Sequence, residues 1–376
     1  MNAPELPPHA KQDAEAALRE KEALLQQLQQ KLNALSADVQ AKEAVIQELA
    51  WALETERSNK IWRRSARYLR SRARSARTRL RAILGIRLGR LVQFQPQAMK
   101  LPAHYYRPIR VRKVAKISIV TPSFRQAAFI ERTLQSVLDQ NYPGLEYVVQ
   151  DGGSQDGTKE ILERYADRLA SWESRPDKGQ SQAINLGFAR TSGEIMAWLN
   201  SDDVLLPGTL AYVARYFQRH PEVDVVYGHR ILIDENDRQI GRWMMPPHDD
   251  QVLSWADYIP QETLFWRRSI WEKAGGCIDE SFRFAMDWDL LVRFRQAGAR
   301  FARLPRFLGA FRIHTAQKTS AEISSTGIQE MMRLRERMLG RVPQDQEIWH
   351  AVLPYLRRHV MTDLAWRVRR SLGMPT

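Results

Sequence analysis

Asp202 and Asp203 are the side chains whose type and spacing most directly suggest chemistry. They follow the apolar run "IMAWL" at residues 195–199 almost directly, and a Pro-Gly stop follows at residues 207–208. A buried strand that ends in two adjacent carboxylates brings together charges that repel each other unless a cation binds between them. Hard oxygen ligands suit Mg²⁺ or Mn²⁺, which keep several waters and bind substrate phosphates. The pair therefore predicts a divalent-metal site that holds a diphosphate.

Two other predicted strands also end in polar residues. Thr121-Pro122-Ser123 closes the run "KISIV", and Asp151 opens "DGGS" after "LEYVVQ". Either ending alone is ordinary turn sequence. Ligands of open parallel sheets bind beyond the carboxyl ends of the strands, so we expect the three strand endings to converge on one edge.

The elements that must position these residues begin at Lys116. Strands are expected over residues 116–124, 145–153 and 193–203, and helices over 127–140, 157–169 and 179–191. Alternation of short apolar runs with helical patterns predicts an α/β domain with a mainly parallel central sheet flanked by helices. Beyond it, residues 321–376 contain two basic amphipathic helical patterns. These are compatible with packing on the catalytic domain, with forming part of an acceptor cleft, or with touching a membrane.

The N-terminal 56 residues carry a heptad repeat. Apolar residues recur every seven positions over residues 14–56, at Leu18, Leu25, Leu32, Val39, Ile46 and Leu53. This pattern predicts a coiled coil and, through it, a homo-oligomer. A long solitary helix is the alternative.

A strongly basic segment follows at residues 57–92. The chain has a formal net charge of +14, yet twenty Lys or Arg residues and no Asp or Glu lie between Arg57 and Ile130. Arginines interleaved with residues such as Trp62 and Leu69 predict an amphipathic helix on an anionic membrane surface. An RNA-binding segment, which we favour less, and a solvated helix that caps the catalytic domain are the alternatives. Residues 93–115 are expected to form a linker.

The expected location is cytoplasmic, at the inner face of the cell membrane. No stretch approaches the roughly 18 consecutive apolar residues of a membrane-spanning helix, and the first residues lack the pattern of a secretory signal. A single cysteine excludes an intrachain disulfide and a cysteine zinc cluster. The basic segment adds the peripheral attachment to the membrane.

Several motifs, taken in order, resemble those of family 2 glycosyltransferases of the GT-A fold over residues 116–320. They are "SIVTPSF", "VVQDGGSQDGT", "SRPDKGQSQAINLGFARTSGEIMAWLNSDD", "PQETLFWRRSIWEKAGG", "FAMDWDLLVRF" and "FRIHTAQKTS". The resemblance implies a GT-A fold and an enzyme that moves a sugar from a nucleotide-sugar donor, UDP-type by expectation, to a glycan or lipid-linked acceptor.

The resemblance also implies a donor site and a metal site. Thr121 and Pro122 would border the nucleotide base, Asp151 would accept a uracil-type N–H, and Asp177 would contact the base or ribose. Lys178 and the backbone amides after it would neutralise the phosphates. The remaining assignments are Asp203 as principal ligand of Mn²⁺ or Mg²⁺, Asp202 beside it or on the ribose, and His314 as a further ligand of the metal or diphosphate.

The implied reaction is a single displacement with inversion. Asp287 matches the family's base, although Met286 replaces the usual preceding Glu. Asp289 is expected to be a cap or a donor-site contact. Residues expected near the acceptor are Gln261, Glu262 and Trp288.

The leading prediction is thus a metal-dependent inverting glycosyltransferase in cell-surface polysaccharide or glycolipid synthesis. A nucleotidyltransferase is the first alternative, but "TPSFRQAAF" lacks the glycine-rich phosphate loop expected near its first strand. A non-catalytic membrane- or RNA-binding scaffold with a decayed enzyme domain is the second. The complete set of acids, from Asp151 to Asp287, argues against decay.

Overall fold

The computed structural model describes residues 93–314 and 326–371. The predicted coiled coil and the basic segment of residues 57–92 lie outside the described residues, so both remain predictions. Within the described ranges, no helix combines the length and the apolar character required to cross a membrane.

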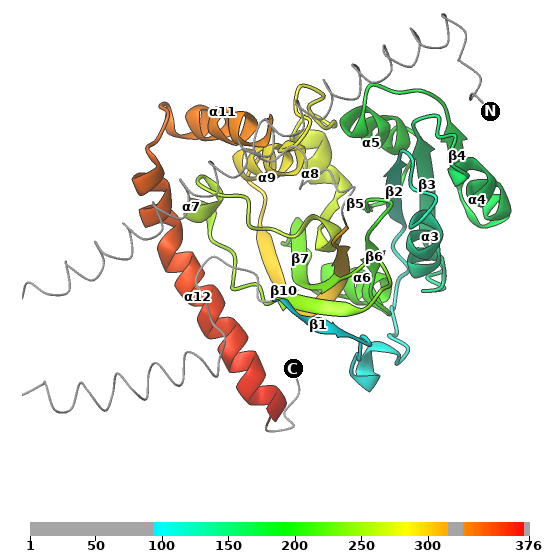
Figure 1. Cartoon of the computed structure of the whole chain (residues 1–376), viewed down its shortest axis with the longest axis horizontal. Helices are drawn as coiled ribbons and strands as arrows, with labels where there is room; N and C mark the ends of the chain where they lie inside the picture. Colours follow the sequence, from blue (N-terminus) through cyan, green and yellow to red (C-terminus); the bar gives the residue numbers. More distant parts are fainter. Residues whose placement is uncertain (1–92, 315–325, 372–376) are drawn as a thin grey trace, which may run out of the picture. The chain divides into compact units, whose positions relative to one another are not determined.

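A mixed sheet forms the centre of the described domain (Figure 1). Its strands are β1 (Gln93–Gln97), β2 (Ile117–Ser123), β3 (Leu145–Asp151), β4 (Ser171–Ser174), β5 (Ile195–Trp198), β6 (Val204–Leu205), β7 (Val225–Ile233), β8 (Gln239–Trp243), β9 (Phe265–Arg267) and β10 (Phe301–Arg312). The main path runs β1-β8-β7-β9-β5-β2-β3-β4, and β10 pairs with β6 and β7.

Helices flank this sheet. They are α3 (Ile130–Leu138), α4 (Thr158–Arg164), α5 (Gln180–Phe188), α6 (Thr209–Arg219), α7 (Asp250–Leu253), α8 (Arg268–Lys273), α9 (Met286–Gln296), α11 (Ile328–Leu339) and α12 (Asp345–Ser371). Short 3₁₀ turns are η1 (Ala103–Tyr105), η2 (Ala166–Arg168) and η3 (Gln261–Thr263). The predicted strands and helices of residues 116–203 are all present.

The parallel part of the sheet is the part that the sequence predicted. β2 pairs in parallel with β3 and β5, and β3 pairs in parallel with β4. The other half departs from that expectation, because β9 runs antiparallel to both β5 and β7. The sheet is therefore mostly parallel at its centre and mixed beyond it.

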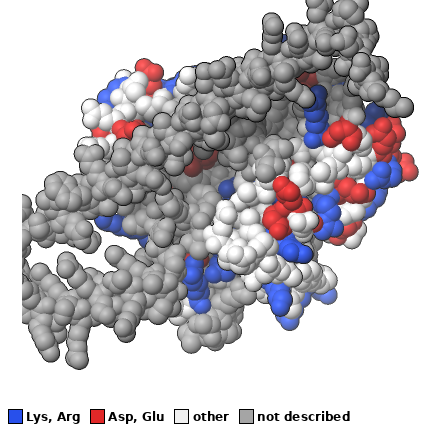
Figure 2. All heavy atoms as spheres, in the orientation of Figure 1, with Lys and Arg blue, Asp and Glu red and all other residues white. Residues whose placement is uncertain are grey.

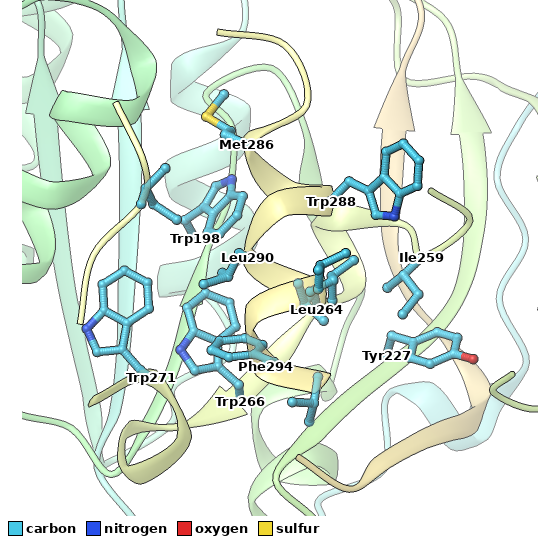
Figure 3. Packing of buried hydrophobic residues seen from close by; sticks show 14 of the residues in the cluster. Trp198, Tyr227, Ile259, Leu264, Trp266, Trp271, Met286, Trp288, Leu290 and Phe294 are labelled. Carbon is cyan, nitrogen blue, oxygen red and sulfur yellow. The ribbon is translucent and has the colours of Figure 1, made fainter. Parts of the chain in front are cut away.

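Both faces of the central strands are buried, as a covered parallel sheet requires. In β2, Ile117 and Ile119 pack with α3 and α6, whereas Val120 packs on the opposite face with α5 and α9. Trp266 and Trp271 pack in the core on the same face as Val120, with ring centroids 6.0 Å apart (Figure 3). Both side chains are therefore part of the hydrophobic core.

Segment 93–115, which the sequence analysis expected to be a linker, contains a strand and a buried tyrosine. β1 pairs antiparallel with β8, and the Tyr105 side chain is buried with its hydroxyl accepting from the Phe307 amide at 3.0 Å. Pairing and burial of this kind tie the segment to the sheet.

The C-terminal helices pack on the catalytic domain. Arg337 of α11 forms an ion pair with Asp289 of α9, with a nitrogen–oxygen distance of 2.6 Å. Tyr355 of α12 packs on Tyr258 with ring centroids 4.3 Å apart. Of the three roles left open by the sequence, these contacts support the first, and Met331 of α11 also reaches the cleft described next.

Candidate active site

A cleft of about 730 Å³ opens at the carboxyl ends of β2, β3 and β5. Ser123, Gly152 and Asp203 bring the three predicted strand endings into its wall, so their expected convergence is confirmed. α9 contributes Asp287 to the same wall. Asp203 and Asp287, which the sequence singled out on separate segments, therefore share one cavity, whereas Asp151 does not line it.

Asp203 is a buried carboxylate with little compensation. Its side chain is 1% exposed, and its Oδ1 accepts one hydrogen bond, from the Arg312 amide at 3.0 Å. Burial raises its pKa well above the usual range, and the charges of Asp202 and Glu262 raise it further. The Arg312 amide and the Arg230 guanidinium act in the opposite direction without cancelling the shift. The site is thus short of positive charge.

Asp202 pairs with His314. The two side chains approach to 3.0 Å between Asp202 Oδ2 and His314 Nε2, and the histidine ring packs on Phe129 with centroids 4.6 Å apart. Among the described residues, no three His, Cys, Asp or Glu side chains are already grouped as a metal-ligand set. Asp202, Asp203 and His314 could supply part of one, with the rest coming from a ligand.

Asp151 and Thr121 turn away from the predicted contacts with a base. The fully buried Asp151 carboxylate accepts hydrogen bonds from the amides of Gly153 and Ser154 and from the hydroxyls of Ser154 and Ser174, at 2.6 to 3.1 Å. Thr121 Oγ1 is buried 2.9 Å from the Tyr147 hydroxyl. Asp151 therefore fixes the turn after β3, and it is the backbone at Gly152 that lines the cleft.

Asp177 lines the cleft, whereas Lys178 does not. Asp177 Oδ1 accepts from the Gly179 amide at 2.8 Å, and its pKa is raised by burial and by the Asp151 charge. Lys178 is exposed and lies in a neighbouring pocket beside Glu280. Gly179 and Gln180, at the start of α5, do face the cleft, so the predicted helix entry is present without its lysine.

Asp287 stands in the first turn of α9, where a helix N-terminus favours a negative charge. Asp257 faces the same cleft from the loop before η3. The Asp257 side chain is accessible from the cleft. The protein packed around it and the charge of Asp287 both raise its pKa. Sequence analysis missed Asp257 because "SWADYIP" has no periodic pattern.

Glu330 of α11 holds the chain that leads into α9. Its carboxylate accepts from the backbone amides of Arg283, Phe284 and Ala285 at 2.8, 2.8 and 2.9 Å. Three charge-assisted bonds to consecutive amides fix the position from which Asp287 projects. Nothing in the local sequence links residue 330 to this loop.

Asp289 is neither a cap nor a donor contact. It is fully buried and pairs with Arg293 at 2.8 Å and with Arg337 at 2.6 Å. The pair with Arg337 joins α9 to α11, and the pair with Arg293 lies within α9, so the residue supports the position of Asp287 from behind.

The three residues expected near the acceptor serve mainly to build the wall. Glu262 is fully buried in an ion pair with Arg230, and Gln261 Nε2 donates to the Trp198 carbonyl at 2.9 Å. Trp288 is also fully buried, with its indole N–H donating to the Leu253 carbonyl at 2.8 Å. Because the ring is fully buried, it has no open face for a sugar, and Figure 3 shows it pointing away from Trp198.

The cleft wall also carries unsatisfied polar atoms and an exposed aromatic ring. Ser123 Oγ, Trp198 Nε1 and Gln261 Oε1 are buried atoms without a hydrogen-bond partner in the described structure. Buried polar groups are normally satisfied, so unsatisfied ones in a cleft wall indicate a place for a ligand. Phe124, at the rim beyond β2, is 55% exposed and presents a ring face.

The sheet and cleft define a GT-A glycosyltransferase. A crystal structure of S. aureus TarS in complex with UDP-GlcNAc has the same fold, with a TM-score of 0.51 and 20% identity over 65% of this chain and 72% of that one. The sequence pattern described as glycosyl transferase family 2 matches residues 118–285.

Sequence relatives agree with this class. An uncharacterized glycosyltransferase of Nostoc is 29% identical over 234 residues, which are 57% of this chain and 70% of the relative. A PGL/p-HBAD biosynthesis glycosyltransferase of Mycobacterium bovis is 31% identical over 180 residues, which are 47% of this chain and 68% of the relative. The chain belongs to glycosyltransferase family 2, and it is a glycosyltransferase.

Proposed function

We propose that this glycosyltransferase uses a nucleotide-sugar donor and a divalent metal, and that it transfers the sugar with inversion. The observation that carries the proposal is the buried carboxylate of Asp203, which opens on the cleft beside Asp202 and, among the residues that the structure describes, forms no ion pair. Mn²⁺ or Mg²⁺ would supply the missing charge and would polarise the diphosphate of a donor. Asp203, Asp202 and His314 are the residues that would hold it.

The donor would lie along the strand ends. Phe124 offers a face for a base at the rim, and Asp177, which lines the same cleft, would lie near the ribose. UDP-GlcNAc in TarS supports a UDP-type donor as the first candidate. Ser123 and Gln261 provide unsatisfied polar atoms deeper in the cleft for hydroxyl or phosphate groups.

Asp287 is the proposed base. It would take the proton of the acceptor hydroxyl while that oxygen bonds to the anomeric carbon and the bond from that carbon to the diphosphate oxygen breaks. Attack opposite the leaving group inverts the configuration. Positioning of the two substrates contributes about 7–11 kcal/mol in well-oriented systems, more than a general base, which gives roughly 10²–10⁴-fold.

For the acceptor and location, we propose a glycan or lipid-linked acceptor at the cytoplasmic face of a membrane. The relative named for PGL/p-HBAD biosynthesis supports a glycolipid or polysaccharide product. The Arg-rich segment of residues 57–92 supports attachment to an anionic surface. Oligomerisation through residues 14–56 is part of the same proposal.

A thermal-shift screen tests the donor and the metal together. UDP-, GDP- and dTDP-sugars are added with Mn²⁺ or with a chelator, and the true donor should give the largest rise in Tm because stabilisation follows affinity for the native state. Asp203→Ala should abolish the metal-dependent part of that rise and the transfer of labelled sugar. Asp167→Asn, an exposed acid outside the cleft, is the matched control. Metal-dependent transfer that survives in Asp203→Ala would overturn the metal assignment.

A further inference from the structure

A second pocket lies where segment 103–109 meets α6, and its lining is basic, whereas that of the cleft is acidic. Its volume is about 370 Å³, and its lining includes four basic residues and no carboxylate: His104, Arg107, Arg215 and Arg306. None of its three arginines pairs with an acid within the described ranges. A concentration of unpaired cations around a cavity is an environment that favours an anion.

Arg306 is the buried cation of this pocket, held in place by neighbouring side chains and a backbone carbonyl. The residue is 6% exposed, and its guanidinium lies 4.0 Å from the ring centroid of Tyr105 and 4.9 Å from that of Tyr212. Its Nη2 donates to the Pro207 carbonyl at 2.9 Å, while its Nε has no partner. Burial lowers the pKa of Arg306, and the nearby charge of Arg215 lowers it further. A bound anion would remove that repulsion.

The pocket depends on a close approach of segment 103–109 to the loop before α6. Gly208 has a φ of 72°, and a Cβ there would lie 3.0 Å from the Tyr105 carbonyl oxygen and 3.1 Å from Arg306 Nη2. Glycine therefore permits the contact that seats Tyr105 and Arg306 together.

A mainly apolar groove of about 750 Å³ adjoins the basic pocket, and the two carboxylates in its lining, Asp139 and Asp237, are paired with arginines. The two cavities share Arg107, Pro108 and Ile109. Val111, Leu205 and Ala211 also line the groove. At its edge Tyr106 and Val114 are 64% and 46% exposed. A cationic pocket beside an apolar groove matches an amphiphile with an anionic head.

We propose that the pocket formed by His104, Arg107, Arg215 and Arg306 binds the phosphate of an anionic lipid headgroup, with the adjoining groove against the apolar part of the lipid. The soluble alternative is a free phosphate, which shares the charge but does not use the groove. In Figure 2, Lys and Arg side chains are visible along the lower edge of the face shown, where Figure 1 places segment 100–113. The site is separate from the catalytic cleft and does not depend on transferase activity.

The test compares two double variants of the full chain that lose the same charge. Arg107→Gln/Arg215→Gln removes two cations from the pocket, and Arg219→Gln/Arg238→Gln removes two exposed arginines outside it. All four positions are at least partly exposed, so the Tm of each variant should stay close to that of the wild type. Binding to phosphatidylglycerol–phosphatidylcholine vesicles is measured by cosedimentation at fixed salt.

The pocket variant should bind these vesicles roughly thirtyfold more weakly than the wild type, because it loses two basic residues at an anionic surface. The control variant should bind less than about threefold more weakly. Equal losses in both variants would show diffuse charge attraction and overturn the site. A second measurement follows the reaction of individual arginines with phenylglyoxal. Vesicles should protect Arg107 and Arg215 but not Arg219. Equal protection by inorganic phosphate at the same phosphate concentration would overturn the lipid assignment.

Discussion

Neutralising the uncompensated carboxylate of Asp203 should have opposite effects on stability and on activity. We expect Asp203→Asn to stabilise the metal-free protein near neutral pH while it removes transfer activity. The amide oxygen can still accept from the Arg312 amide, so the hydrogen bond at 3.0 Å is retained. The change therefore replaces a buried acid, which must either take up a proton on folding or stay charged beside Asp202 and Glu262, with a neutral side chain of nearly the same shape.

The magnitude follows from proton linkage. The pKa of Asp203 is raised in the folded state, so the folded protein holds a proton that the unfolded chain has already lost above a pKa of about 3.9. Between a pH of about 3.9 and the raised pKa of the folded state, the free energy of unfolding of the wild type falls by about 1.4 kcal/mol per pH unit through this one group. For a domain of this size the loss corresponds to roughly 3–5 °C in Tm per pH unit. Asp203→Asn should lack this slope.

Thermal unfolding in chelator between pH 4.5 and 7 measures the effect. The wild type and Asp203→Asn should have similar Tm values at the acid end and diverge as pH rises, with the variant more stable. Asp289→Asn is the matched control, because Asp289 is equally buried but paired with Arg293 and Arg337. Removing its charge leaves two cations uncompensated and should cost about 3–5 kcal/mol.

Addition of Mn²⁺ should then raise the Tm of the wild type and leave that of Asp203→Asn unchanged. The reasoning is refuted if Asp203→Asn is less stable than the wild type at pH 7 in chelator. That result would mean that the carboxylate is stabilised by a partner within the fold, and the argument for a cation at this position would lose its basis.

Further predictions concern the reaction itself. Asp287→Asn should lower kcat by roughly 10²–10⁴-fold and leave the donor Kd unchanged, and Asp203→Ala should lower kcat more, as single-turnover kinetics with labelled donor would show. Asp257→Asn removes the carboxylate whose pKa the Asp287 charge raises, so the pH profile of kcat/KM should change; an unchanged profile would contradict it. Glu330→Gln cannot accept from all three amides of the loop before α9, so it should cost about 1–3 kcal/mol of stability and lower kcat while donor binding stays normal.

Local pattern predicted the parallel half of the sheet well because its elements are strongly apolar. Ile117 and Ile119 on one face and Val120 on the other are read directly from the sequence as a strand buried on both sides. β4 escaped prediction because "SWES" is short and only partly buried. The antiparallel pairing of β9 with β5 and β7 depends on contacts between distant segments, which periodicity does not encode.

The same contrast between local sequence pattern and long-range contact decides which site residues could be predicted. Asp203 was predictable because an apolar strand leads straight to it, and the cleft does contain it. Asp151 occupies an equivalent strand end, yet its carboxylate turns inward to the amides and hydroxyls of Ser154 and Ser174. Glu330 belongs to a helix 45 residues or more from the amides it binds. Side-chain direction and long-range partners decide these roles, and neither is local.

Two buried aspartates show how charge compensation distinguishes a structural acid from a ligand-binding one. Asp289 has two guanidinium partners and joins two helices, so its burial is balanced within the fold. Asp203 is as deeply buried, but its neighbours are other acids, and the nearby cation Arg230 is already paired with Glu262. A buried carboxylate without a cationic partner is destabilising, so its presence is not explained by packing. The missing charge at Asp203 is what a bound divalent cation would supply, and the pH slope of the metal-free protein measures that deficit directly.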